Sequence, residues 1–197
     1  KLWDEYGVLV FTDQHLSGED HVAFSRRFGR LEMGLRRAAA SPLATLTNIA
    51  PDGKVAAPTS LQHRFHVGNT FWHTDSSYKS TGAKASLLAA HVVPQEGGET
   101  EWADMRAAYD VLDEDMKQFL KGKSAVHSYV YSHSWHGGLE IISAEDVKHL
   151  PPVVHPVVRV HPQTGRSNLF VGRHASHIVG EDEQESRALL KKLTEDG

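Results

Sequence analysis

The sequence predicts a mainly β fold, an antiparallel sandwich or jelly roll with flanking helices. Short apolar runs of strand length recur along the chain, and turn residues such as Gly-Gly and Pro-Gln-Thr-Gly separate them. A few segments with helix caps are inserted among these runs. This combination is typical of antiparallel architectures in which the helices pack outside the sheets.

Length and composition predict one domain with one core. The chain has 197 residues, and 40% of them are hydrophobic, which is enough for a single sizeable core. The sequence contains no cysteine, which excludes disulfides and thiolate metal sites. Imidazole and carboxylate remain as metal ligands, and the 14 histidines become the feature to explain.

The charge distribution argues against nucleic acid and membranes as partners. The formal net charge is -4 and the two signs are interspersed, so no basic stripe or polybasic cluster is present. The sequence also has no apolar stretch of membrane-spanning length and no signal-peptide pattern at its start. We therefore expect a cytoplasmic protein with a small-molecule partner, and we leave open whether it is a homo-oligomer.

The first elements are predicted from caps and apolar runs. The chain opens in a short helix that Gly7 closes, followed by a buried strand at residues 8–11. Ser17 and Asp20 have the spacing of a capping box, and the helix that they begin ends at Gly29.

The middle of the chain is expected to be a long loop followed by strands. Residues 34–68 are rich in Ala, Pro, Ser and Arg and contain one convincing strand, at residues 46–49. Further strands are expected at residues 70–75, 86–93 and 100–103, with a Glu-Gly-Gly turn between the last two.

The last third combines capped helices with strands. Asp104 and Asp113 are predicted N-caps of two successive helices, which end near Leu112 and Gly122. The remaining elements are strands at residues 125–131, 155–161 and 168–171, a turn at residues 162–165, and an amphipathic helix at residues 181–193.

His73 and Asp75 are the first candidates for chemistry. They are two residues apart on an expected extended segment, so both side chains leave the same face and can reach one ion. Non-haem iron(II) oxygenases use two histidines and one carboxylate on one face of the metal. The alternative is a strand-end histidine and a turn aspartate that only cap backbone groups.

Three separated blocks place this motif in a context. They are Phe-Trp-His-Thr-Asp-Ser-Ser-Tyr at residues 71–78, Gly-Gly-Glu-Thr-Glu-Trp at residues 97–102, and His-Pro-Gln-Thr-Gly-Arg at residues 161–166. Together they resemble the taurine dioxygenase family of 2-oxoglutarate oxygenases, from Gly7 to the final helix. Residues 104–109 and 171–177 are most similar to the 2,4-dichlorophenoxyacetate dioxygenase branch, which cleaves aryloxyalkanoate ethers.

The resemblance implies a fold, cofactors and residue roles. The fold would be a double-stranded β-helix, the cupin-like jelly roll, and the cofactors would be Fe(II), 2-oxoglutarate as co-substrate and O2. His73 and Asp75 match two iron ligands and are the catalytic candidates. Thr100 matches a threonine that contacts a 2-oxoglutarate carboxylate, and Asn69 matches an asparagine of the substrate pocket. Without the family, Thr100 could equally be a residue that simply starts a strand.

Other polar residues are candidates for binding the substrate. His174 and His177 could face a carboxylate or ether oxygen, since imidazole donates hydrogen bonds, although histidines three apart are often only a surface turn. Anion binding is also open to four cations that would ordinarily be solvated: Arg173, Lys54, Arg36 and Arg37. Most of five other histidines are expected to be structural: His127, His133, His136, His155 and His161.

Two parts of the family pattern have no match in this sequence. The third iron ligand of the family is a histidine, and an arginine that binds 2-oxoglutarate follows it; both would lie beyond Gly197. We therefore expect residues 1–197 to be a single dioxygenase domain that is incomplete at both ends.

The predicted function is hydroxylation of a small carboxylate substrate. The favoured substrate is an aryloxyalkanoate, which would be cleaved at its ether to a phenol and an oxo-acid. One alternative keeps the chemistry and changes the substrate to taurine, an alkylsulfonate or an alkyl sulfate. Another is a non-catalytic jelly-roll binding protein, and a zinc hydrolase is disfavoured because no glutamate has the spacing of a metalloprotease base.

Overall fold

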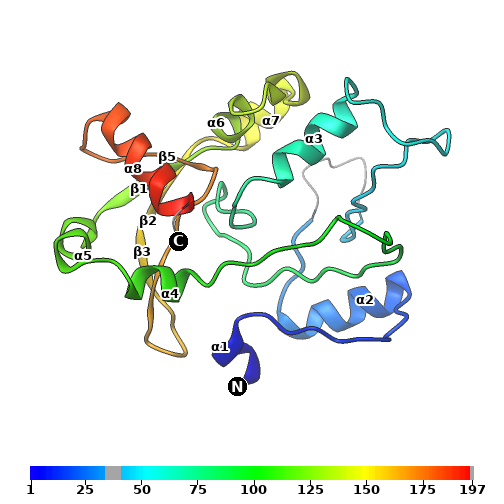
Figure 1. The fold of residues 1–197 in the computed structure, drawn as a ribbon, viewed down its shortest axis with the longest axis horizontal. Helices are drawn as coiled ribbons and strands as arrows, with labels where there is room; N and C mark the ends of the chain where they lie inside the picture. The colour runs from blue at the N-terminus through cyan, green and yellow to red at the C-terminus, as the bar shows by residue number, and fades with distance from the viewer. Residues whose placement is uncertain (34–40, 196–197) are drawn as a thin grey trace. The chain divides into compact units, whose positions relative to one another are not determined.

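The computed structural model (Figure 1) describes residues 1–33 and 41–195, and the chain divides into two compact units. The first unit comprises Lys1–Thr45 and Ala83–Ala103, and the second comprises Leu46–Gly82 and Asp104–Gly197. The expectation of one domain over the whole chain stays a prediction.

The helices of the first unit follow the predicted caps. α1 (Leu2–Tyr6) ends at Gly7, which has a φ of 74°. α2 (Gly18–Ser25) begins in a complete capping box, in which Ser17 accepts from the Asp20 backbone and Asp20 accepts from the Ser17 backbone. The 3-10 helix η1 (Arg26–Phe28) continues α2 to Gly29. The prediction of this helix and its end is confirmed.

Aromatic rings, and no strand, hold the described part of this unit together. Phe28 packs edge-on against Trp3 and Phe24, with ring centroids 5.7 and 5.4 Å apart, and Phe24 contacts Phe11 at 6.2 Å. The strand expected at residues 8–11 is wrong, because Phe11 is 61% exposed and packs through its ring. A strand requires backbone pairing with a partner, which an apolar run alone does not reveal.

Residues 86–93 and 100–103, also in the first unit, do not form the expected strands. Val92 and Val93 are largely exposed, so these apolar residues do not mark a buried strand. The expected turn between the segments is confirmed, since Gly97 and Gly98 both have positive φ angles.

Two small antiparallel sheets lie in the second unit (Figure 1). In the three-stranded sheet, β1 (Ser124–His127) is central and pairs with β2 (Val153–Pro156) and β5 (Ala175–Ile178). The register of β1 and β5 shifts between Val126 and His127. β3 (Val158–Val160) and β4 (Ser167–Leu169) form a hairpin.

Helices pack against both sheets of this unit. α8 (Glu183–Glu195) lies against β5, and α4 (Met105–Asp110) lies against β4. The other helices are α3 (Leu61–Asn69), α5 (Glu114–Leu120), α6 (Tyr129–Ser134), the 3-10 helix η2 (Gly138–Ile141) and α7 (Ala144–His149). No helix in the described part of the chain is long and apolar enough to cross a membrane.

The core of the second unit lies between the strands and these helices. β1 and β5 contribute Ala125 and Ile178, which face each other in the ladder and are fully buried. α8 contributes Leu190 and Leu193. The remaining buried apolar side chains of this cluster are Ala108, Leu120, Val157, Leu169, Val171 and Ala175.

Most of the elements predicted in the last third of the chain are confirmed. Asp104 caps α4 and Asp113 caps α5 through their carboxylates, and the turn before β4 places Gly165 at a φ of 70°. The strand expected at residues 125–131 is too long. The chain leaves β1 after His127, because the Ser128 hydroxyl accepts from the Tyr131 backbone and begins α6.

The predicted long loop is only partly correct. Of residues 34–68, residues 34–40 lie outside the described part of the chain, and the strand expected at residues 46–49 is reduced to one bridge between Ile49 and Val55. α3 was not predicted. Ser60 caps it through the His63 backbone amide, but its polar composition hides the helical pattern.

Candidate functional site

The segment that carries the proposed metal motif is a turn and not the expected strand. Residues 75–78 form this turn, in which the Ser77 amide donates to the Thr74 carbonyl at 3.3 Å and the Lys79 amide donates to the Ser76 carbonyl at 3.0 Å. Ser76 has a φ of 56°. The prediction of alternating strand side chains was therefore wrong for residues 70–75, although the two candidate ligands still meet.

His73 and Asp75 bring a nitrogen and an oxygen donor atom close together. His73 Nε2 lies 3.3 Å from Asp75 Oδ1. The other ring nitrogen, Nδ1, lies 2.7 Å from the Phe71 carbonyl oxygen and donates to it, because a carbonyl only accepts. This hydrogen bond leaves Nε2 as the nitrogen that can bind a metal.

The geometry of this pair fits a shared cation. With the proton on Nδ1, His73 Nε2 and Asp75 Oδ1 are two acceptor atoms 3.3 Å apart, and a metal ion can take an electron pair from each. Imidazole and carboxylate bind first-row metals at about 2.0–2.2 Å, so two adjacent octahedral ligands lie about 3 Å apart. The side chains are 25% and 54% exposed, which leaves the pair accessible.

Gly172 and Arg173 pack directly on the backbone of this segment. The Arg173 amide donates to the Trp72 carbonyl at 2.9 Å. Gly172 has a φ of 125°, and a Cβ there would lie 3.0 Å from His73 Cα. The close approach requires glycine, and it holds the His73 backbone against the segment that leads into β5.

Arg173 is a buried cation beside the pair. Its side chain is 5% exposed, its Nη1 donates to the Gly68 carbonyl, and its Nε has no hydrogen-bond partner. Among the described residues it forms no ion pair within 4 Å. Burial lowers the pKa of Arg173, while Tyr129, Tyr78 and Asp75 raise it. Such a cation is costly unless an anion compensates it.

His174 lies next to Arg173 and is neutral. It is 2% exposed, its ring centroid is 4.8 Å from that of Tyr78 and 6.3 Å from that of His73, and its Nδ1 has no partner. Burial lowers the pKa of His174 to about 2, and the charge of Arg173 and the neighbouring His73 add to this effect. A neutral imidazole with one unsatisfied nitrogen can still bind a ligand atom.

His133 and His136 join the same region, although neither was among the predicted site residues. A Cβ at Gly68 would lie 2.4 Å from Arg173 Nη1 and 2.9 Å from His136 Nε2, so both groups lie against one point. Neither ring nitrogen of His136 has a partner. His133 donates from Nδ1 to the Tyr129 carbonyl at 2.9 Å. Burial lowers the pKa of both histidines.

Only the spacing of His133 and His136 in the sequence could have pointed to them. His133 and His136 are three residues apart, as are His174 and His177. That spacing alone does not place a histidine in a site, because it does not show which segments the fold brings together. α6 and β5 meet only through long-range packing.

The other expected site residues lie in different parts of the described structure. Asn69 ends α3, half-buried and next to Gly68. His177 pairs with Val126 in the β5 ladder, and its Nδ1 lies 2.9 Å from Ser176 Oγ. Thr100 is exposed and belongs to the first unit. The roles of these residues stay predictions.

The remaining cations do not add to the cluster. Lys54 is exposed in a turn of the second unit. Arg36 and Arg37 lie outside the described residues. Arg173 is therefore the only one of the four anion-binding candidates that the described structure places beside His73.

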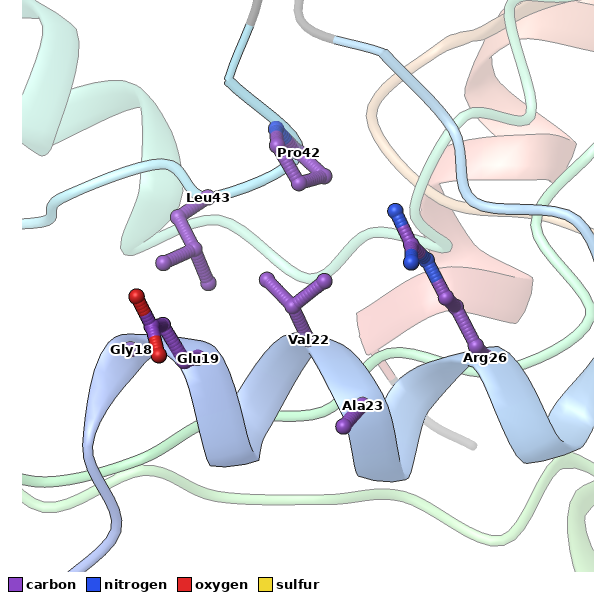
Figure 2. A pocket seen from close by; sticks show the side chains of 7 residues that line it. All are labelled: Gly18, Glu19, Val22, Ala23, Arg26, Pro42 and Leu43. Atoms are coloured by element: carbon purple, nitrogen blue, oxygen red, sulfur yellow. The ribbon is translucent and has the colours of Figure 1, made fainter.

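One pocket lies in the first unit, against α2 (Figure 2). It has a volume of about 400 Å³, and Val22 and Leu43 point toward each other across it. Its complete lining is Gly18, Glu19, Val22, Ala23, Arg26, Pro42 and Leu43. It has no histidine and none of the predicted site residues, so it is not the candidate metal centre.

His73 and Asp75 remain two donors in this structure. Within residues 1–33 and 41–195, no group of three histidine or carboxylate side chains could hold a metal ion. A facial iron site needs three protein ligands. The pair therefore fits two of them.

A histidine and a carboxylate held this close are two of the three ligand types of a non-haem iron oxygenase site. The chain belongs to the taurine catabolism dioxygenase TauD, TfdA family, whose model matches residues 1–195. The family resemblance expected from the three sequence blocks is confirmed.

Individual relatives cover nearly the whole chain. It is 41% identical to an (S)-phenoxypropionate/alpha-ketoglutarate-dioxygenase of Sphingobium herbicidovorans, over 97% of this chain and 66% of the relative. It is also 41% identical to an alpha-ketoglutarate-dependent 2,4-dichlorophenoxyacetate dioxygenase of Cupriavidus pinatubonensis, over 99% and 70%. The chain thus spans about two thirds of the length of these curated relatives.

Solved structures of related proteins have the same fold over this length. The crystal structure of AAD-2 in complex with Mn(II) and N-oxalylglycine matches with a TM-score of 0.88 and 40% identity, covering 98% of this chain and 68% of that chain. A putative alpha-ketoglutarate dependent 2,4-D dioxygenase from Burkholderia xenovorans matches with a TM-score of 0.82 and 33% identity, covering 98% and 65%.

Proposed function

We propose that this protein is an Fe(II)- and 2-oxoglutarate-dependent dioxygenase that hydroxylates an aryloxyalkanoate. The observation that carries the proposal is the His73–Asp75 pair, whose facing acceptor atoms lie 3.3 Å apart with the His73 tautomer set by Phe71. The names of the relatives from Sphingobium herbicidovorans and Cupriavidus pinatubonensis support the reaction and the substrate class.

His73 and Asp75 would supply two of the three protein ligands of the iron. The third histidine and the arginine for 2-oxoglutarate are expected from the third of the relatives' length that this chain does not span. Thr100 would contact a carboxylate of 2-oxoglutarate. When bound, iron with 2-oxoglutarate and O2 supplies the oxidising power to hydroxylate a carbon–hydrogen bond.

The buried polar groups beside the pair support an anionic substrate. Arg173 would neutralise a substrate carboxylate, which would in turn relieve the cost of its own burial. His174 is neutral and has a free ring nitrogen that could meet the ether oxygen. Asn69 and His177 are proposed to complete the substrate pocket.

These contacts would determine which carbon reacts. With its carboxylate held at Arg173, the substrate would present the adjacent carbon, which also bears the ether oxygen, to the metal site. Hydroxylation of that carbon forms a hemiacetal or hemiketal. This product then breaks its carbon–oxygen bond to release a phenol and an oxo-acid.

The overall architecture proposed for this function is the double-stranded β-helix of the family. The described sheets, of three and two antiparallel strands, are compatible with parts of such a jelly roll. We also propose that residues 1–197 belong to one dioxygenase domain, acting in the cytoplasm on a small molecule.

A sulfonate or sulfate ester is the second candidate substrate. Arg173 would pair with a sulfonate as well as with a carboxylate, because both are oxyanions that accept from a guanidinium. The same site could therefore take taurine, an alkylsulfonate or an alkyl sulfate.

A turnover assay tests the proposal. The complete metal-free protein is incubated with Fe(II), ascorbate, O2 and 2-oxoglutarate, and release of succinate and phenol is followed for a panel of aryloxyalkanoates, alkylsulfonates and alkyl sulfates. We expect coupled succinate and phenol with aryloxyalkanoates, and loss of both in His73→Ala. His149→Ala, in an exposed histidine of α7, is the matched control.

The outcomes separate the candidates. Succinate that depends on a sulfonate or sulfate ester, without phenol from aryloxyalkanoates, would favour the second substrate class. A folded protein that binds no iron and forms no succinate with any substrate would instead point to a non-catalytic binding protein.

A further inference from the structure

His155 makes a side-chain hydrogen bond to the turn that carries the metal motif. It lies in β2, is 5% exposed, and its Nε2 is 2.8 Å from the Lys79 carbonyl oxygen. Its other nitrogen, Nδ1, is 2.9 Å from Arg159 Nη2. A carbonyl only accepts and a guanidinium only donates. Nε2 must therefore carry the proton while Nδ1 accepts, which fixes the ring in one neutral tautomer.

Arg159 is itself held in place. It lies in β3, and its guanidinium carbon is 3.4 Å from the centroid of the Phe170 ring. Phe170 also packs edge-on against His155, with ring centroids 5.3 Å apart. The imidazole of His155 is thus fixed by a hydrogen bond on one side and by ring packing on the other.

The Lys79 carbonyl lies four residues beyond Asp75, at the end of the turn. The Lys79 amide donates to the Ser76 carbonyl inside this turn. The Tyr78 ring, one residue earlier, lies 4.8 Å from the rings of Tyr129 and His174. A contact at Lys79 therefore restrains both the proposed ligand Asp75 and a wall of the proposed substrate site.

The turn has a second attachment at its other end, made by backbone alone. The Arg173 amide donates to the Trp72 carbonyl, and Gly172 packs on His73. Residues 72–79 are thus tied to the sheet region at both ends, and His155 supplies a side-chain hydrogen bond at the Lys79 end.

We propose that His155, oriented by Arg159, is a positioning residue that holds the Asp75 turn through the Lys79 carbonyl and so sets the geometry of the metal site. The metal part of this proposal rests on the proposed function, whereas the effect on the turn does not. Partners of this kind, which orient ligands without touching the metal, typically change metal affinity by about 10–100-fold.

Amide hydrogen exchange on the complete metal-free protein tests the effect on the turn. His155→Phe keeps a ring of similar size and removes both hydrogen bonds. We expect exchange of the Ser77 and Lys79 amides to accelerate about tenfold, the effect of losing one hydrogen bond. His155→Gln should restore slow exchange, because one amide can donate to Lys79 and accept from Arg159.

His127→Phe is the matched control. His127 is fully buried and its ring packs on both His155 and Phe170 at 5.2 Å, but its replacement removes no hydrogen bond to the turn. Unchanged exchange of these amides in His155→Phe would overturn the proposal, as would equal acceleration in His127→Phe. If His155→Phe does not fold, Arg159→Met is measured, and unchanged exchange of the same amides there would also overturn it.

Mn(II) binding, followed by electron paramagnetic resonance of the free ion, tests the metal part. We expect His155→Phe to weaken Mn(II) binding about tenfold and His155→Gln to restore it. If the Ser77 and Lys79 amides of His155→Phe exchange rapidly but the variant binds Mn(II) with wild-type affinity, the link between His155 and the metal site is overturned. No Mn(II) binding by the wild-type protein would count against the proposed function, and the exchange comparison would still decide the role of His155.

Discussion

Gly172 lies against the backbone of His73. A Cβ at Gly172 would be 3.0 Å from His73 Cα, 3.3 Å from the Trp72 carbonyl oxygen and 3.4 Å from the Thr74 amide nitrogen. The φ of Gly172 is 125°, which side chains also disfavour. One position without a side chain thus allows the segment that leads into β5 to pack on the backbone of the metal motif.

Gly172→Ala is expected to destabilise the protein and weaken metal binding. The new methyl meets backbone atoms on the His73 side, so the segment must move or the backbone must change its φ angle. Strain of this kind costs on the order of 1–3 kcal/mol. The free energy of unfolding from urea denaturation and the Mn(II) dissociation constant would measure the two effects.

Gly165→Ala separates the two causes. Gly165 also has a positive φ, of 70°, but a Cβ there would meet nothing within 4 Å. It should lower the free energy of unfolding and leave Mn(II) affinity unchanged. Equal effects of the two variants on metal affinity would contradict a specific role for the Gly172–His73 contact.

Arg173→Met is expected to weaken substrate binding without loss of stability. The guanidinium is 5% exposed and its Nε is unpaired. Replacing such a buried cation by an apolar side chain of similar length is often neutral or stabilising. If Arg173 pairs with the substrate carboxylate, the dissociation constant for a phenoxyalkanoate should rise about tenfold or more, as measured by calorimetry.

Arg187→Met is the control for Arg173→Met. Arg187 lies on α8, is 45% exposed and pairs with Glu183, so its replacement should leave substrate binding unchanged. A stable Arg173→Met protein with wild-type affinity for the carboxylate would remove Arg173 from the proposed pocket.

Local signals in the sequence predicted helices better than strands. Ser17, Asp104 and Asp113 were identified as N-caps because capping depends on residues a few positions apart. The strand expected at residues 8–11 depended instead on an unseen partner, and no ladder forms there. The turn at residues 75–78 was also missed, since Ser76 adopts a positive φ that its residue type does not announce.

The candidate site was predictable where its residues are adjacent in sequence. His73 and Asp75 are two residues apart, so their pairing survived the wrong assignment of the segment to a strand. Arg173 and His136 meet only because both pack against Gly68, more than 60 positions away from either in the chain. No spacing rule reports such a contact. The burial of Arg173 could likewise not be read from a residue type that is usually solvated.

Asp75→Asn is expected to weaken metal binding strongly with little change in fold. Asparagine keeps the size of the side chain and removes the charge that faces His73 Nε2. The loss of a direct charged ligand should raise the Mn(II) dissociation constant by on the order of 100-fold, the upper range for groups that act only indirectly. Asp52→Asn, in an exposed turn of the same unit, should leave it unchanged. Similar Mn(II) affinity in both variants would mean that Asp75 is not a ligand.

His127 should make the protein less stable in acid. It is fully buried, and burial lowers its pKa to about 3, with smaller effects from His155 and the charge of Arg159. Between the unfolded pKa of about 6.5 and this value, the unfolded chain binds a proton that the folded protein does not. The contribution of His127 to the free energy of unfolding therefore falls by about 1.4 kcal/mol per pH unit as the pH decreases. In His127→Phe that slope should disappear. The free energy of unfolding of the variant, measured by urea denaturation, should therefore rise relative to that of the wild type from pH 6 to pH 4.

His149→Phe, at an exposed position, is the control. A constant difference in the free energy of unfolding between wild type and His127→Phe over this pH range would show that His127 is protonated in the folded protein.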